Sequence, residues 1–313
     1  MWTDSDITAM RKALLDWYDR EGRTLPWRVR LEDRAKGVIP DPYAIWLSEI
    51  MLQQTTVPHG TPYWFKFLSI YPTVADLAAA PLDDVLTHWA GLGYYARARN
   101  LHKCANVIVE EHGGEFPSTY KELLKLPGIG DYTASTIAAI CFDEATTIVD
   151  GNVERVITRL HELDSPLPKA KPEIKKLASV LSDAVRPGDY GQAVMDLGAT
   201  ICTPRSPSCL LCPWQDWCQA SAHGTQANYP KKTPKKKMPI RYGRAYVYYN
   251  DKSVWLRRRP EDGLLGGMME VPGTDWGSNP VETAPEGESW TRLIAPIGSR
   301  HFHHTAQKAV FRT

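Results

Sequence analysis

The sequence predicts a mainly α-helical chain of two domains, and three observations lead to this fold class. Apolar residues recur at helical spacing from Asp4 to about His223, and no β-rich stretch of comparable length interrupts them. A basic segment that contains prolines follows and lacks periodicity. Beyond it, short strand-like runs alternate with glycines. We therefore expect a large helical domain followed by a smaller α+β domain.

The composition excludes several classes of protein. The chain has 313 residues, which exceeds the usual single domain, and its apolar share of 43% and charged share of 23% are ordinary for a globular protein. No apolar stretch approaches the roughly 20 residues of a membrane helix, and the N-terminus shows no secretory pattern. We expect a cytoplasmic monomer without a membrane partner, associated with the nucleoid if its source is bacterial.

The helices of the first domain, residues 1–228, follow from apolar spacing and capping residues. The first helix is expected between a cap at Asp4 or Ser5 and Gly22, which stands just past its end. Further helices are expected near Ala44–Thr55, Pro62–Ile70, Val74–Ala80, Leu82–Trp89, Ala96–His112, Tyr120–Leu126, Tyr132–Phe142, Asn152–Leu160 and Lys171–Ala184.

A linker at residues 229–243 separates this domain from residues 244–313. Seven basic residues and no acidic residue lie between Tyr229 and Asn250, whereas the net charge of the whole chain is only +1. A nucleic acid would therefore be held by local patches and backbone donors. Ala245–Tyr249 and Val254–Arg257 are predicted to be strands around a turn. Because the sequence stops in a strand-like run, truncation of this domain is one interpretation.

Four of the six cysteines form a compact cluster. Their spacing is Cys202-x6-Cys209-x2-Cys212-x5-Cys218, so a single loop could bring four thiolates around one centre. Reduced core cysteines are the alternative interpretation. Zinc sites usually pair two Cys-x-x-Cys knuckles and only one is present, so the spacing favours an iron–sulfur cluster at least as strongly as zinc.

A glycine turn joins two predicted helices within residues 117–142. Gly128 and Gly130 permit positive φ and close backbone approach, and the amide groups that open the next helix form a site for an anion. This is typical of a helix-hairpin-helix motif that holds a DNA phosphate. A tight connection between two helices, without a ligand, is the alternative.

Two carboxyl groups are candidates for acid and anion in the same reaction. Glu49 lies on a helix that is apolar around most of its circumference, with Gln53 one turn later; burial would raise the pKa of this carboxyl and make it a general acid. Asp150 precedes an amphipathic helix, and as its N-cap would stay ionised. One protonated and one ionised carboxyl are what cleavage of a glycosidic bond requires. A solvated polar stripe and simple helix capping are the alternatives.

Taken together, these segments closely resemble the MutY adenine DNA glycosylases, members of the helix-hairpin-helix superfamily that includes endonuclease III. The resemblance covers nearly all of residues 1–228. Its segments are Leu25–Arg28, Trp46–Thr55, Gly91–Leu101, Leu126–Gly130, Val149–Val153 and the loop of four cysteines at 202–218.

The resemblance implies roles for individual residues. Glu49 would protonate the extruded adenine and activate water, while Asp150, supported by Asn152, would stabilise the anomeric carbon. Gln54 and Tyr94 would wedge into the duplex. The resemblance also implies an adenine pocket lined by Trp27 and Arg28, and a 4Fe–4S cluster held by Cys202, Cys209, Cys212 and Cys218.

The residue at the position of Tyr132 distinguishes bifunctional from monofunctional enzymes within this superfamily. Bifunctional relatives carry a lysine two residues after the second hairpin glycine, and its amine attacks the sugar. Tyr132 occupies that position here, so no Schiff base can form there. The resemblance therefore implies a monofunctional hydrolase that leaves an abasic site.

The second domain resembles the Nudix-like domain with which MutY enzymes recognise 8-oxoguanine opposite adenine. The segment Gly263–Gly273 carries this likeness, and no Arg-Glu-x-x-Glu-Glu metal box follows it, so binding is expected rather than pyrophosphate hydrolysis. Phe302 and His304 match the lesion-sensing loop, although this chain has Phe-His-His where the family usually has Phe-Ser-His or Phe-Thr-His. The role of His303 stays open, and a loop that binds nothing is the alternative.

The implied substrate is double-stranded DNA with adenine opposite 8-oxoguanine, and adenine opposite guanine is a second candidate. Two other functions are weighed. An endonuclease III-like pyrimidine glycosylase is disfavoured by Tyr132 and by the second domain. In a non-catalytic DNA-binding iron–sulfur protein, Glu49 and Asp150 would serve only the structure.

Overall fold

The computed structural model describes residues 2–234, 239–243, 245–246, 249–250, 253–254, 256–260 and 266–278. The chain divides into two compact units, which are described separately. The first unit comprises Met1–Lys236 with Arg259–Met268, and the second comprises Lys237–Arg258 with Met269–Thr313.

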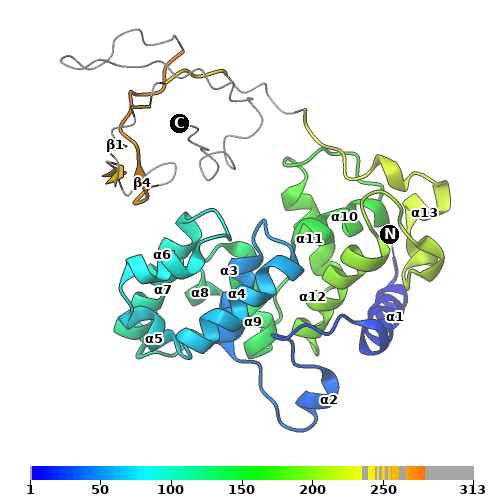
Figure 1. The fold of residues 1–313 in the computed structure, drawn as a ribbon. Coiled ribbons are helices and arrows are strands. Elements are labelled where there is room, and N and C mark those ends of the chain that lie inside the picture. The colour runs from blue at the N-terminus through cyan, green and yellow to red at the C-terminus, as the bar shows by residue number, and fades with distance from the viewer. Residues whose placement is uncertain are drawn as a thin grey trace. The chain divides into compact units, whose positions relative to one another are not determined.

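The first unit is helical throughout the part that the structure describes (Figure 1). Its α-helices are α1 Asp4–Glu21, α2 Leu31–Arg34, α3 Pro42–Leu52, α4 Val57–Ile70, α5 Val74–Ala79, α6 Leu82–Trp89, α7 Ala96–His112, α8 Tyr120–Leu123, α9 Asp131–Phe142, α10 Gly151–Leu160, α11 Lys171–Leu181, α12 Pro187–Asp196 and α13 Gln219–His223. One π-helical turn, η1 Leu197–Ile201, continues α12, and three short 3-10 turns follow: η2 Cys209–Leu211, η3 Gln215–Trp217 and η4 Gln226–Asn228.

Two hydrophobic cores fill this unit, and helix α9 contributes to both. One core gathers buried side chains from α3 to α9, including Trp46, Phe67 and Trp89. The other joins α1, α10, α11 and α12 and includes Trp214 from the cysteine loop. Because α9 packs against α3 on one side and α12 on the other, it is apolar around most of its circumference. The start of α9 therefore lies where the two cores meet.

The helices predicted from apolar spacing are present, with ends that differ by a few residues. The helix expected at Ala44–Thr55 runs over Pro42–Leu52, because Asp41 caps it by accepting a hydrogen bond from the Tyr43 amide at 2.9 Å. Helix α12 was not predicted as a separate element. It is buried on every side and contains Gly188 and Gly191, so it shows neither an amphipathic period nor strong helix propensity.

The second unit contains two short antiparallel pairs in its described part. Strands β1 Tyr249–Asn250 and β2 Ser253–Val254 form a hairpin, and β3 Arg257–Arg258 pairs with β4 Met269–Glu270. The hairpin was expected, but its first strand includes Asn250, one residue beyond the predicted Ala245–Tyr249, because Asn250 pairs with Ser253. Residues 279–313 lie outside the described part, so the Nudix-like fold expected for this region remains a prediction.

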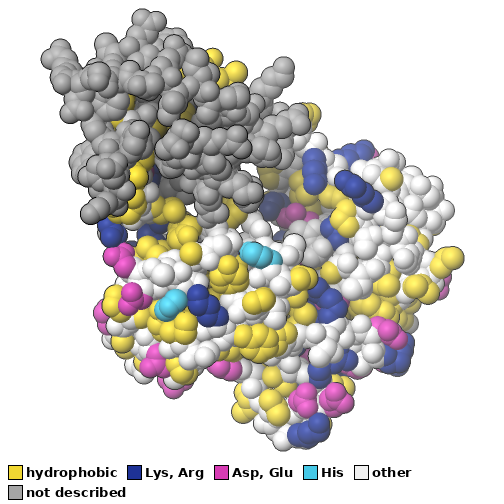
Figure 2. Space-filling model, viewed as in Figure 1, with side chains coloured by type: hydrophobic (Ala, Val, Ile, Leu, Met, Phe, Trp, Pro, Cys, Tyr) yellow, Lys and Arg dark blue, Asp and Glu magenta, His cyan; other side chains and the backbone are white. Residues whose placement is uncertain are grey.

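None of the described helices is long and apolar enough to cross a bilayer. On the face shown in Figure 2, basic side chains are scattered among acidic and uncharged ones.

Candidate active site

Glu49 projects from the buried helix α3. Its neighbours Ser48 and Ile50 are at most 5% exposed, and Glu49 itself is partly buried. Burial raises the pKa of this carboxyl to about 7; a hydrogen bond from Tyr132 and the charge of Arg28 act in the opposite direction. The carboxyl group is therefore about half protonated at neutral pH. A solvated polar stripe, the alternative interpretation, does not describe this environment.

Tyr132 brings α9 into the same site. The residue is the second of α9, just after the glycine turn, and its hydroxyl lies 3.5 Å from Met195 Sδ. Burial raises the pKa of the phenol well above its usual value, and the negative charges of Glu49 and Asp150 act in the same direction. Tyr132 thus lies within electrostatic reach of both carboxyl groups, which come from different helices.

Asp150 caps helix α10, as the sequence predicts. Its Oδ1 accepts from the amides of Asn152 at 2.8 Å and Val153 at 2.7 Å, and its Oδ2 accepts from Asn152 Nδ2 at 2.8 Å. Burial nevertheless outweighs these hydrogen bonds, so the pKa of Asp150 is raised above its usual value. The three donors favour the ionised form, whereas no such set of donors surrounds Glu49 among the contacts that the structure describes. Asp150 therefore has three donors that favour its charged form, whereas Glu49 has one, Tyr132.

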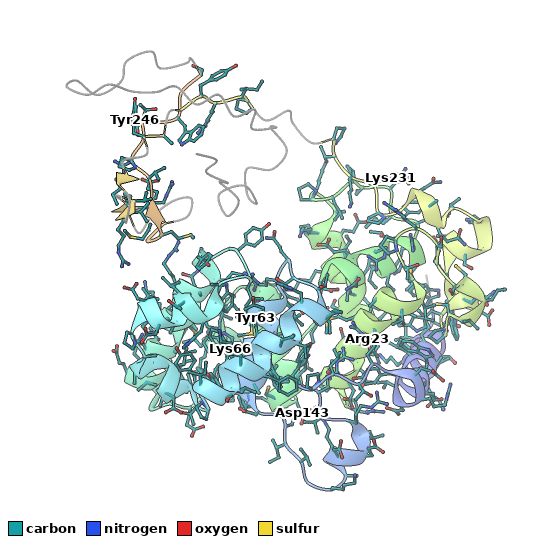
Figure 3. The ribbon with its side chains drawn as sticks, in the orientation of Figure 1. Arg23, Tyr63, Lys66, Asp143, Lys231 and Tyr246 are labelled. Carbon is teal, nitrogen blue, oxygen red and sulfur yellow. The ribbon has the colours of Figure 1, made fainter. Side chains whose placement is uncertain are left out.

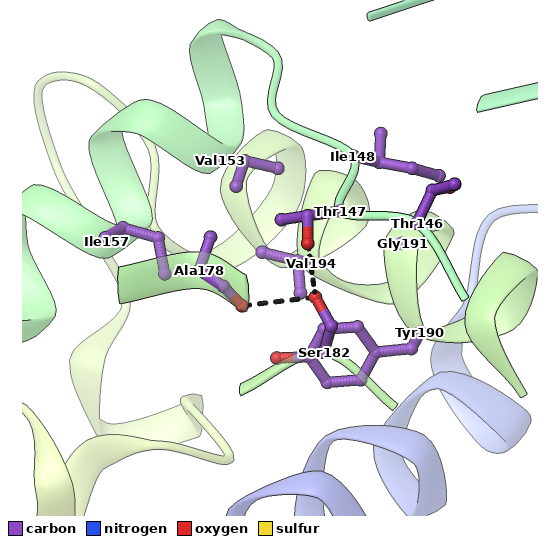
Figure 4. A pocket seen from close by; sticks show the side chains of 10 residues that line it. All are labelled: Thr146, Thr147, Ile148, Val153, Ile157, Ala178, Ser182, Tyr190, Gly191 and Val194. Atoms are coloured by element: carbon purple, nitrogen blue, oxygen red, sulfur yellow. Dashed lines mark hydrogen bonds between the residues drawn. The ribbon is translucent and has the colours of Figure 1, made fainter. Parts of the chain in front are cut away.

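Hydrogen bonds to neighbouring helices fix the segment before Asp150. A small pocket lies between residues 146–148 and helices α10, α11 and α12 (Figure 4). Within it, the hydroxyls of Thr147 and Ser182 are 3.2 Å apart, and the Ser182 hydroxyl also donates to the Ala178 carbonyl at 3.2 Å. These contacts hold the chain that leads into Asp150, so the position of its carboxyl group is built into the fold.

Arg155, which the sequence analysis did not single out, joins the Asp150 cap to the cysteine loop. Its Nη2 donates to Asn152 Oδ1 at 2.9 Å, and its Nε donates to the Cys202 carbonyl at 2.7 Å. Since Asn152 also donates to Asp150, a continuous chain of hydrogen bonds runs from the candidate anion to the first cysteine. A signal was present in the sequence: an arginine among apolar neighbours on an amphipathic helix requires buried acceptors.

The four cysteines of the predicted ligand set lie in one loop, residues 202–218, and all four are partly buried. Burial raises the pKa of the Cys212 thiol to about 12, and the charges of Cys202, Cys218 and Cys209 act in the same direction, which shows that the four lie close together. Four thiolates in this arrangement repel one another, so ionisation requires a positive centre among them, and iron would supply it.

Hydrogen-bond donors also surround the sulfur atoms. Arg159 Nη1 donates to Cys202 Sγ at 3.3 Å, and Gln226 Nε2 donates to Cys209 Sγ at 3.6 Å. Arg159 also binds the carbonyls of Thr203 and Pro204, so it fixes the loop from inside. Such donors are common around the sulfur ligands of iron–sulfur clusters. The residues present therefore fit a 4Fe–4S cluster, which would order the loop when bound.

Trp27 and Arg28, expected in an adenine pocket, make structural contacts. Trp27 is buried in the first core and meets Trp64 edge to face at 5.6 Å. Arg28 forms two hydrogen bonds to the buried Asp196, at 2.7 and 2.8 Å, and Arg23, labelled in Figure 3, binds the same carboxylate. The charge of Arg28 still lowers the pKa of Glu49, so this ion cluster acts on the site electrostatically.

The predicted wedge residues lie at the surface in strained backbone conformations. Gln53 ends α3, and the next residue, Gln54, is exposed with φ of 59°. Tyr94 is 51% exposed with φ of 48°. Residues other than glycine rarely adopt positive φ, and such strain concentrates at functional sites.

The glycine turn forms the predicted helix-hairpin-helix connection between α8 and α9. Gly128 has φ of 76°, and a Cβ atom there would lie 2.7 Å from Asn100 Cβ. Gly130 is the N-cap of α9, which leaves the first amides of that helix without a side-chain cap. The turn therefore combines a packing requirement with exposed donors. Phe302 and His304 lie outside the described residues, so their roles remain predictions.

Comparison with known proteins agrees with this arrangement. Residues 47–182 match the HhH-GPD superfamily base excision DNA repair protein family, and residues 202–218 match the iron–sulfur binding domain of endonuclease III. The chain is 36% identical over 264 residues to the adenine DNA glycosylase of Buchnera aphidicola subsp. Acyrthosiphon pisum (strain APS), covering 83% of this chain and 72% of that protein. The chain belongs to the adenine DNA glycosylase family.

Other relatives extend the likeness. The adenine DNA glycosylase of Schizosaccharomyces pombe is 33% identical, with 93% of this chain and 73% of that protein covered. The human adenine DNA glycosylase is 35% identical over 97% of this chain, but the chain spans only 64% of that protein's length. Among solved structures, a thermostable thymine-DNA glycosylase aligns with a TM-score of 0.61 and 28% identity over 70% of this chain and 98% of its own. The predicted family and iron–sulfur domain are therefore confirmed.

Replacement of Glu49 by glutamine should change how stability depends on pH. Because the folded-state pKa of about 7 lies above the ordinary 4.5, the folded protein binds more protons than the unfolded chain between these values, and Glu49 lowers stability as pH rises through that window. At pH 8 Glu49→Gln should be more stable than the parent, by up to about 3 kcal/mol. Urea unfolding at pH 5 and pH 8 measures this difference, with Glu110→Gln on the exposed face of α7 as control. Equal stability of parent and Glu49→Gln at pH 8 would contradict it.

Removal of one cysteine ligand should release iron and loosen the Asp150 cap. Cys212→Ala leaves three thiolates, so the purified variant should lose most of its iron and its visible absorbance. Cys141→Ala, which changes a cysteine outside the loop, should retain both. Hydrogen exchange should then become faster at the amides of Asn152 and Val153 in Cys212→Ala alone, because Arg155 and Arg159 lose their ordered acceptors. Full iron content in Cys212→Ala would refute the proposed ligand set.

Proposed function

We propose that this chain is an adenine DNA glycosylase of base excision repair, which hydrolyses the N-glycosidic bond of adenine opposite 8-oxoguanine and leaves an abasic site. The observation that carries the proposal is the pair of unlike carboxyl groups. Glu49 is desolvated and has a pKa of about 7, while Asp150 accepts three hydrogen bonds, and both act electrostatically on Tyr132. Membership of the adenine DNA glycosylase family supports the choice of base.

The reaction balances with these groups alone. Glu49 donates its proton to the extruded adenine, so the bond between the anomeric carbon and the base nitrogen breaks with its electron pair on the base. Asp150 stabilises the oxocarbenium-like sugar that results. Water then adds to the anomeric carbon, and its proton returns to the Glu49 carboxylate. The products are free adenine and an abasic site.

Tyr132 supports hydrolysis rather than strand cleavage. Its phenol is held neutral by burial and by the two nearby carboxyl groups, and it has no amine that could bond to the sugar. The same position makes an endonuclease III-like lyase the weaker candidate. Asn152 takes a positioning role, because it both donates to Asp150 and accepts from Arg155.

The DNA contacts proposed here come from separate segments. The exposed amides at Gly130 would hold one phosphate, and Gln54 and Tyr94 would fill the gap that the extruded base leaves. Gln53 would contact the neighbouring base step. Trp27 and Arg28 would support the adenine site without contacting the base, because Trp27 is buried and Arg28 forms a buried ion pair with Asp196. Recognition of 8-oxoguanine is assigned to the second domain, through Phe302 and His304.

Single-turnover release of adenine tests the proposal. With a duplex that carries adenine opposite 8-oxoguanine, Glu49→Gln and Asp150→Asn should each lose about 100-fold or more in rate, while Glu110→Gln should match the parent. No adduct should be trapped with borohydride. A parent protein that releases oxidised pyrimidine instead, or that forms the adduct, would favour the endonuclease III-like function. Carboxyl variants with full activity would leave only a structural role for the pair.

A further inference from the structure

Two surface loops that carry the proposed wedge residues share one side chain. The first loop follows α3 and contains Gln54, and the second precedes α7 and contains Tyr94. Both residues have positive φ, which costs free energy unless neighbouring contacts compensate. Something in the fold must therefore hold both loops.

Arg97, in the first turn of α7, binds the C-terminal end of α3, the helix that carries Glu49. Its Nη1 donates to three carbonyl oxygens, those of Ile50 at 2.8 Å, Met51 at 3.0 Å and Gln53 at 2.6 Å. The last carbonyls of a helix have no backbone partner within the helix, and a cation is favourable at the C-terminal end of a helix. The first of the three carbonyls belongs to the residue next to Glu49.

The other nitrogen of the same guanidinium binds the second loop. Arg97 Nη2 donates to the carbonyls of Leu92 at 2.9 Å and Gly93 at 3.2 Å. The guanidinium carbon also lies 5.2 Å from the ring centroid of Trp89 and 5.6 Å from that of Tyr94. One planar group therefore joins the backbone beside Gln54 to the backbone and ring of Tyr94.

Three further side chains complete the support of the second loop. The Tyr63 hydroxyl, from α4 (labelled in Figure 3), donates to the Ala90 carbonyl at 3.0 Å. His59 Nε2 lies 3.2 Å from the Gly91 carbonyl, and Trp89 Nε1 donates to the Gly93 carbonyl at 2.9 Å. Each carbonyl from residue 90 to residue 93 thus has a side-chain partner. Only Arg97 also reaches the loop that contains Gln54 among the contacts described.

We propose that Arg97 is a positioning residue that holds Gln54 and Tyr94 ready, as a pair, to enter the duplex when adenine is extruded. The inference rests on the proposed glycosylase function. Base extrusion costs free energy for unstacking, and loops that are already ordered add no further cost at that moment. A lysine cannot replace the group, because the Nη1 and Nη2 donors, fixed in one plane, are needed to bind carbonyls on two loops.

The test is Arg97→Lys, which keeps the positive charge and removes the planar guanidinium group. The probe is a duplex with 2-aminopurine, a fluorescent isomer of adenine, opposite 8-oxoguanine, and stopped-flow fluorescence follows its unstacking in a Glu49→Gln background. We expect the rate constant of unstacking to fall about tenfold or more. Tyr63→Phe, which removes one hydrogen bond to one loop, should lower it about threefold. Arg186→Lys, at an arginine bound to Asp19 and Asp189 away from these loops, should leave it unchanged.

Two further measurements separate positioning from folding. In single-turnover adenine release with Glu49 intact, Arg97→Lys should lower the rate constant while the amplitude and the pH midpoint stay at the parent's values. A lower amplitude with an unchanged rate constant would show a folding defect and overturn the proposal, as would unstacking at the parent's rate in Arg97→Lys. If the parent itself releases no adenine, the proposed function fails first; if the parent is active and only the Arg97 result is negative, the function stands and this inference falls.

Discussion

The carboxyl group of Glu49 loses its water when α3 packs into the core, and the rest of the site depends on how that loss is balanced. A full ion pair would keep the group ionised and useless as an acid. Instead Arg28, whose charge could supply one, is bound to Asp196, so it reaches Glu49 only through space. Tyr132 adds one neutral partner. The result is a carboxyl group that exchanges a proton near neutral pH.

Asp150 shows the opposite solution to the same problem of burial. Three donors of the helix that it caps surround it, two backbone amides and the Asn152 side chain; they fix its position and favour its ionised form, although burial still raises its pKa. The helix is fixed in turn by Arg155 and Arg159, whose acceptors belong to the cysteine loop. A series of hydrogen bonds between contacting groups therefore links the cysteine loop, which is distant in the sequence, to the carboxyl group of Asp150.

Much of this arrangement could be predicted from the sequence, because it depends on local patterns. Helix spacing located α3, α7 and α10, the residue before α10 indicated a cap, and the cysteine spacing indicated a shared centre. What could not be predicted depends on contacts between distant segments. Asp196 pairs with Arg28 across 168 positions, Arg155 reaches the cysteine loop, and Arg97 reaches back to α3. The spacing of residues along the chain does not predict such pairings. Helix α12 was not predicted because a helix buried on all sides has no polar face.

Titration of the Glu49 carboxyl by ¹³C NMR tests the central claim most directly. Protein labelled at the side-chain carboxyl carbon of glutamate would be followed from pH 4 to pH 9, and the Glu49 signal would be assigned by its absence in Glu49→Gln. We expect a midpoint of about 7. A midpoint near the ordinary value of 4.5 would show that this carboxyl group is ionised at neutral pH, and it would contradict the proposed role of Glu49 as the acid.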